Sequence, residues 1–338
     1  MAIDISDAPP VRGPLNATPP RRPGSVRRTS TIDMTWPGGR GSQLRLLGRA
    51  RDLLTPADGA SPRVVAEDVV RIGVGRDRTI EDIVAEPRRA TIGELVGARG
   101  GGRLRGILGE VLPAERAAGT PLYLLLDDIS GATLIAGFAH SQWDAGSTSD
   151  TAPRPTPRRR MEGICTGFQT GSSALDREPP RPEARRVQPV DQLPDPDDPL
   201  GWHRMDEAEG VSMRRARRID VRLADGLVEV DAMFQDSASR PDGGRAAVHE
   251  YRIEATADPD TLELLSLSAD PRILPFGECP LAVRGIDRMI GTPLPAMRTA
   301  VLDELKGING CTHLNDALRA LAEVPVLARP LSEKPFAV

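Results

Sequence analysis

The sequence predicts an α+β protein made of two related units, each an antiparallel sheet followed by C-terminal helices. In the second half of the chain, runs rich in β-branched residues precede stretches with helical spacing. Short landmarks from this half recur in the same order in the first half, which indicates an internal duplication. A chain of 338 residues is long enough for two domains of ordinary size.

The repeat is carried by four short matches that keep their order along the chain. Each match is brief, and the shared order is what favours a duplication. The gaps between the matches differ, so the residue-level register between them stays open. The matched pairs are Ser25–Asp33 with Ser212–Asp220, 78–87 with 260–271, the tetrapeptides ending at Gly97 and Gly291, and 126–128 with 314–316.

Strand patterns come first in the second unit. The segment 219–234 predicts two strands around Asp225-Gly226, a dipeptide typical of a tight hairpin turn. Alternation of apolar and polar residues continues over 248–256, and 262–269 predicts a further strand. We expect these strands to form an antiparallel sheet.

Helical patterns follow after Pro275. Apolar spacing predicts helices over 279–291 and 294–307, with Gly307 placed to end the second of them. A last helix is expected over 311–324, because its leucines recur at intervals that put them on one helical face. The unit is therefore α+β, with its helices at the C-terminal end.

Prolines and mixed charges divide the chain into five parts. The first 24 residues contain six prolines and few apolar side chains, which favours disorder. A second stretch rich in Pro and Arg favours an extended linker. The predicted parts are a disordered arm over 1–24, a degenerate repeat unit over 25–145, a linker over 146–210 with a docked segment at 161–175, a second unit over 211–325 and a tail over 326–338.

Charge and cysteine content exclude several classes of protein. With 44 Lys and Arg against 48 Asp and Glu, the chain lacks the basic excess of a dedicated nucleic-acid binder. It has no run of about 18 apolar residues that could span a bilayer, and its three cysteines are too few for a disulfide scaffold. The first residues lack the pattern of a secretory signal. We therefore expect a cytoplasmic protein with reduced thiols that binds neither nucleic acid nor membrane.

Cysteine and histidine residues mark the candidate site in the second unit. Cys279 and Cys311 lie where the chain enters predicted helices, and free backbone N–H groups there favour a thiolate. His313 lies two residues beyond Cys311, so the pair offers sulfur and nitrogen ligands to zinc or iron. Cys165 and His249 are candidates for further ligands. The first unit contains no cysteine, so the repeated fold does not require these thiols.

Three functions stay open at this point. The first is a protein that binds zinc, iron or an iron–sulfur cluster through Cys279, Cys311 and His313, with Cys165 or His249 as the fourth ligand. The second is a thiol enzyme in which Cys311 is the nucleophile and His313 or His249 is the base. The third is a non-catalytic adaptor whose surface binds a protein partner. The cysteines also suit simple packing, since free cysteine is often a small buried apolar residue.

The second unit resembles DUF2889, a bacterial family of proteins of unknown function. The resemblance rests on IDVRLADGLVEVDAMFQDS, HEYRIEA, ECP and LKGINGCTHLNDALRAL and covers roughly 211–325. With a first unit and the segment MEGICTGFQTGSSAL, the arrangement is similar to actinobacterial members. The order of cysteines and helices is also similar to iron–sulfur scaffold proteins of the NifU type, which implies a metal rather than covalent catalysis. The DUF2889 resemblance implies no activity, and it places the family pattern on Cys279, Cys311, Thr312, His313 and His249.

Overall fold

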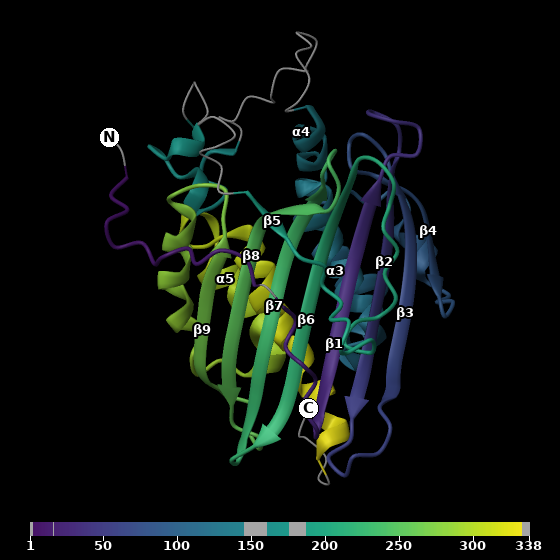
Figure 1. The fold of residues 1–338 in the computed structure, drawn as a ribbon, viewed down its shortest axis with the longest axis vertical. Coiled ribbons are helices and arrows are strands. Elements are labelled where there is room, and N and C mark those ends of the chain that lie inside the picture. The colour runs from purple at the N-terminus through teal and green to yellow at the C-terminus, as the bar shows by residue number, and fades with distance from the viewer. Residues whose placement is uncertain (1–2, 16, 145–160, 176–186, 333–338) are drawn as a thin grey trace.

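In the part of the chain that the structure describes, nine strands form one antiparallel sheet (Figure 1). The computed structural model describes residues 3–15, 17–144, 161–175 and 187–332. The strand order is β4-β3-β2-β1-β6-β7-β8-β5, and β9 also pairs with β8. The strands are β1 (Ser25–Thr35), β2 (Leu44–Thr55), β3 (Arg63–Val74), β4 (Ile80–Glu86), β5 (Gln188–Val190), β6 (Ser212–Ala224), β7 (Leu227–Ser239), β8 (Arg245–Ala257) and β9 (Leu264–Ile273).

The two halves of the sheet follow the same path. β1–β4 form one antiparallel meander and β6–β9 form another, and β1 pairs with β6 to join them. An α+β fold with antiparallel strands and several helices is therefore confirmed. The predicted units do not have separate sheets, because the β1–β6 ladder runs along all of β1, from Ser25 opposite Arg222 to Thr35 opposite Ser212.

Helices cover one face of the sheet, and the N-terminal segment crosses the other (Figure 1). Over 279–289 of the predicted helix 279–291 the structure has a 3-10 helix; Gly285 in its interior disfavours an α-helix, whereas Pro280 lies in the first turn, where its missing N–H costs nothing. The α-helices are α1 (Leu104–Val111), α2 (Pro113–Ala118), α3 (Pro121–Ile135), α4 (Phe138–Asp144), α5 (Met297–Glu304), α6 (Thr312–Arg319) and α7 (Val324–Ala328). The 3-10 helices are η1 (Ile92–Leu95), η3 (Thr166–Phe168), η4 (Ser173–Leu175), η6 (Cys279–Met289), η7 (Leu294–Ala296), η8 (Gly307–Asn309), η9 (Ala320–Glu323) and η10 (Arg329–Leu331).

The predicted hairpin of the second half is confirmed. Asp225 and Gly226 both have positive φ, 54° and 74°, as a two-residue hairpin turn requires. The turn places Ala224 opposite Leu227 and so sets the register of β6 against β7. The strands predicted after it correspond to β8 and β9.

The other face of the sheet is covered by the N-terminal segment and by residues shortly before β6. The Leu15 N–H donates to Glu250 Oε1 at 2.6 Å, and Thr18 Oγ1 donates to the Leu193 carbonyl at 2.6 Å. These contacts stand in place of the disordered arm expected over 1–24. Composition could not indicate them, because the partners of this segment come together only in the folded sheet.

Other connecting segments also have defined contacts. Thr166, in the segment expected to dock, donates its backbone N–H to the Gly310 carbonyl at 2.9 Å. Within the expected linker, β5 pairs with β8, whereas 145–160 and 176–186 lie outside the described residues. At the C-terminus, α7 and η10 continue the helical layer where a tail was expected.

One apolar stretch is long enough to cross a membrane by length and composition alone. It covers Pro121–Asp144 and contains α3 and α4, and 78% of its most apolar window is buried inside the protein. Asp127 and Asp128 interrupt it, so it is not the continuous apolar run that sequence analysis looked for. α3 packs against β1, β2 and β3, which accounts for its apolar character.

Candidate metal centre

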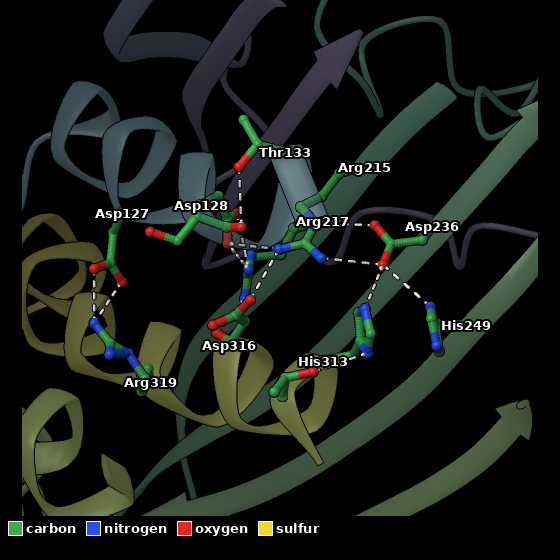
Figure 2. Close-up of polar contacts among 12 residues, drawn as sticks. Asp127, Asp128, Thr133, Arg215, Arg217, Asp236, His249, His313, Asp316 and Arg319 are labelled. Atoms are coloured by element: carbon green, nitrogen blue, oxygen red, sulfur yellow. Dashed lines mark hydrogen bonds and ion pairs between the residues drawn. The ribbon is translucent and has the colours of Figure 1, made fainter. Parts of the chain in front are cut away.

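The strand registers bring polar residues together beneath α6. Arg215 of β6 lies opposite Asp236 of β7, and Asp236 lies opposite His249 of β8. His313 belongs to the first turn of α6, which places its ring over the same strands (Figure 2). The β7–β8 register shifts directly after Asp236, and such irregularities often lie beside functional sites.

Asp236 is the centre of this group. Its Oδ2 lies 3.4 Å from His249 Nδ1 and 3.6 Å from His313 Nε2. Neither nitrogen makes a hydrogen bond of normal length and angle with any described residue, although both are buried. The two imidazole rings stack, with centroids 3.5 Å apart and planes inclined by 18°. Among the described residues, this is the one set of three or more His, Cys, Asp or Glu side chains whose ligand atoms all lie within 4.8 Å of one another.

Burial and neighbouring charges set the protonation of the group. Burial opposes ionisation of Asp236, but Arg215 and the adjacent imidazoles outweigh it and lower the pKa of the carboxyl. Burial lowers the pKa of His249, against the attraction of Asp236. Burial and the neighbouring His249 hold the pKa of His313 well below its ordinary value. At neutral pH the group is therefore one carboxylate beside two neutral imidazoles.

Arg215 binds both oxygens of the Asp236 carboxylate, including Oδ2, which faces the histidines (Figure 2). Its Nε donates to Asp236 Oδ1 at 2.9 Å, and its Nη2 donates to Oδ2 at 3.1 Å. Its Nη1 donates to Asp316 Oδ2 at 2.9 Å. The guanidinium carbon lies 4.9 Å from the centre of the Phe234 ring. A two-pronged pair with a packed guanidinium leaves the Asp236 carboxylate little freedom to rotate.

The charges around Asp236 are balanced. Nearest to Asp236, three arginines face three aspartates; Asp128 is contributed by α3 of the first half, and Arg105 continues the ion pairs to Asp127. Paired charges of this kind can be buried, whereas an isolated charge would shift its protonation instead. The members are Arg105, Arg215, Arg217, Asp128, Asp236 and Asp316, joined by a chain of ion pairs.

The three cysteines lie together beside His313, in a separate region. Cys165, Cys279 and Cys311 are unpaired and buried. Burial raises the pKa of all three thiols, to about 12 for Cys165. The Sγ of Cys311 lies 3.9 Å from Nδ1 of His313, the ring nitrogen that faces away from Asp236.

The structure therefore divides the predicted ligand set into two groups. His249 and His313 lie together, as expected. The third member of their group is Asp236, which was not among the predicted ligands. The sulfurs of Cys165, Cys279 and Cys311 do not all lie within 4.8 Å of one another. One tetrahedral zinc ion would hold them about 4 Å apart, so these thiols and His313 are not assembled as the expected four-ligand site.

A signal for Asp236 was present in the sequence. The Asp225-Gly226 turn fixes which residues of the two hairpin strands face each other. Pairing the strands outward from this turn places Asp236 opposite Arg215, one of the arginines that recur in both halves.

A comparison with family models covers the part of the chain that carries this centre. Residues 213–327 match the family Protein of unknown function (DUF2889). The resemblance inferred from the sequence is thereby confirmed. Asp236, His249 and His313 lie within this DUF2889 region, whereas Cys165 lies outside it. No curated protein and no solved structure matches the chain; the actinobacterial two-unit arrangement stays a prediction.

Proposed function

We propose that this protein binds a divalent transition-metal ion, zinc or iron(II), through Asp236, His249 and His313. The observation that carries the proposal is the pair of buried, unbonded nitrogens, His249 Nδ1 and His313 Nε2, beside one carboxylate oxygen. A buried nitrogen without a partner is costly unless an ion or water satisfies it. Two imidazoles and one carboxylate are typical ligands of zinc and iron(II).

The charge states support ion binding near neutral pH. Metal ions bind neutral imidazole and ionised carboxylate, the forms that the lowered pKa values of these groups provide. Arg215 would act from outside the ligand set by orienting Asp236. Because the lone pair of each nitrogen lies in the plane of its ring, the stacked rings must turn apart to direct both lone pairs at one ion.

The thiol-enzyme alternative has less support. A cysteine nucleophile needs a thiolate and access to its substrate. Burial raises the pKa of the Cys311 thiol, so the protonated form dominates at neutral pH. The adaptor alternative is independent of these contacts and stays a separate proposal.

We also propose that the chain arose by duplication. Arg27 pairs with Asp220, and Arg214 pairs with Asp33, across the β1–β6 ladder. All four residues belong to the landmark shared by Ser25–Asp33 and Ser212–Asp220, so the two ion pairs are equivalent under the repeat. Two copies of one segment that face each other antiparallel would produce this reciprocal pairing.

The metal centre would belong to the second copy alone. The Arg28–Asp52 ion pair of the first half corresponds in position to Arg215–Asp236. Opposite Asp52, however, stands Ala66, where the second half has His249. The residue before the landmark 126–128 is Leu125, where the second half has His313. The first copy would thus keep the ion pair and lack both imidazoles.

Equilibrium dialysis of the reduced protein against zinc or cobalt(II) tests the metal proposal. We expect His249→Ala combined with His313→Ala to weaken binding at this centre by more than about 100-fold, because two of three ligands are lost. In a background with all three cysteines changed to serine, an ion concentration 100 times Kd should add about 2.7 kcal/mol to the unfolding free energy of the protein that keeps both histidines, and less than about 0.5 kcal/mol to that of the double histidine variant.

The matched control is His140→Ala, because that ring packs against Trp36 and not at the centre. The variant with all three cysteines changed to serine should still bind this ion. In that cysteine-free background, the proteins with and without the two histidines are compared. Equal binding of the ion by both would contradict the proposal and would mean that Asp236, His249 and His313 have only a structural role.

A further inference from the structure

Three thiols from distant parts of the chain converge beside the candidate metal centre. Cys165 precedes η3, Cys279 begins η6, and Cys311 is the residue before α6. A Cβ added at Gly167 would lie 2.7 Å from the Cys279 Sγ and 3.9 Å from the Cys165 Sγ. Glycine at this position therefore allows the segment that carries Cys165 to approach Cys279 closely.

Backbone N–H groups lower the pKa of the Cys165 and Cys311 thiols, although burial outweighs them. Backbone N–H groups of Gly167, Phe168 and Thr312 are directed at Cys165, and those of His313 and Leu314 at Cys311. Hydrogen bonds of this kind stabilise a thiolate relative to a thiol, and they surround the sulfurs of metal–thiolate sites.

Tyr251 places a buried hydroxyl at the same thiol cluster. Its side chain is fully buried, and its hydroxyl has no hydrogen bond of good geometry. Burial raises the pKa of this hydroxyl, and the neighbouring thiols, with Cys311 as its hydrogen-bonding neighbour, raise it further. A buried phenol hydroxyl normally finds a partner, and here the polar neighbour is the thiol cluster itself, where the hydroxyl could donate to a metal-bound Cys311 thiolate.

We propose that Cys165, Cys279 and Cys311 form a second metal site that takes a thiophilic divalent ion of the zinc type. On binding, each S–H loses its proton to solvent and forms a metal–sulfur bond, so one ion replaces three protons. Bonds of about 2.3 Å would hold all three sulfurs about 4 Å apart, whereas in the structure at least one pair is separated by more than 4.8 Å. The segment with Cys165 is the part that would move, since Thr166 ties it to the Ile308 and Gly310 carbonyls through its side chain and backbone rather than through a sheet or long helix.

His313 would couple the two sites. Its Nδ1 faces Cys311 and its Nε2 faces Asp236. A Cys311 thiolate accepts a hydrogen bond, so it favours the His313 tautomer with the proton on Nδ1 and leaves Nε2 free for an ion. Filling the thiol site should therefore tighten binding at the Asp236 centre.

Cadmium(II) titration of the full-length, reduced protein at pH 7 tests the thiol site. Cadmium bound by thiolates absorbs in the ultraviolet by charge transfer from sulfur, and carboxylate or imidazole ligands lack this band. We expect the band to saturate at one ion per chain and nearly three protons to be released with it, because the raised pKa values keep all three thiols protonated beforehand. Absence of the band, or release of two protons or fewer, would overturn the three-thiol site.

Two glycine variants test the geometry without removing a thiol. Gly167→Ala should weaken formation of the charge-transfer band at least about tenfold, because the new Cβ would collide with the Cys279 sulfur. Gly106→Ala is the control, because a Cβ there meets open space. Equal effects of the two changes would contradict the proposed approach of the Cys165 segment.

The two metal proposals can fail separately. The double variant His249→Ala/His313→Ala should keep the charge-transfer band. It should lose the ion at the Asp236 centre, which binds without releasing protons. The cysteine-to-serine variant should lose the band and keep that ion. Circular dichroism checks that each variant is folded, and the wild-type titration decides the thiol site even if a variant does not fold.

Discussion

Replacement of Arg215 with methionine (R215M) is expected to lower the free energy of unfolding by about 3–5 kcal/mol. The Arg215 side chain is 1% exposed and ion-pairs with both Asp236 and Asp316. Asp316 would keep its pair with Arg105, whereas Asp236 has no other arginine within ion-pair distance in the described structure. The substitution therefore leaves a fully buried carboxylate without its cation. Chemical denaturation followed by circular dichroism measures the loss.

The control is Arg222→Met on the same strand. Arg222 pairs with Glu229, and both side chains are 33% exposed, so its loss should cost about 0–1 kcal/mol. Asp236→Asn removes the carboxylate charge that R215M leaves without a partner. The double variant R215M/D236N should therefore lose less unfolding free energy than the sum of the losses in the two single variants. If R215M and R222M were equally stable, the buried pair would contribute no more than a surface pair does.

Local structure in the second half could be predicted because its signals are local. The Asp225-Gly226 turn and the alternation around it depend only on neighbouring residues. The pairing of β1 with β6 depends on two segments that are far apart in sequence, and no local pattern encodes it. Its physical reason is visible in the fold, since pairing these strands removes one exposed edge from each half of the sheet.

The candidate site could be predicted only in part for a similar reason. The chain has four histidines; His313 was singled out by its spacing from Cys311, and His249 by its place on a predicted strand of the same unit. The chain has 48 acidic residues, and Asp236 differs from the others only through its register against Arg215 and His249. The thiols were identified as residues, but the sequence does not specify where each sulfur points. Cys165 in particular reaches the others through a docking contact made by Thr166.

A fall in pH from 7 to 5 is expected to cost about 2 kcal/mol of unfolding free energy through His203 alone. His203 is 3% exposed, and its two ring nitrogens lie 2.9 Å from Thr29 Oγ1 and Thr31 Oγ1. Burial, reinforced by nearby arginines, lowers the pKa of this imidazole from 6.5 to about 3. Between these two values the unfolded chain binds a proton and the folded chain does not, so stability is present above about pH 6.5 and is lost as pH falls.

His203→Gln isolates this contribution, because glutamine can hydrogen-bond the two threonines but does not titrate. The measurement is the unfolding free energy at pH 7 and pH 5, and the wild type should lose about 2 kcal/mol more than the variant between them. His249 and His313 have lowered pKa values and act in the same direction, but they are present in both proteins and cancel in the comparison. The lowered pKa of Asp236 affects stability only near and below the ordinary carboxyl value of 3.8, outside this window. Equal losses in both proteins would show that the fold does not keep His203 neutral.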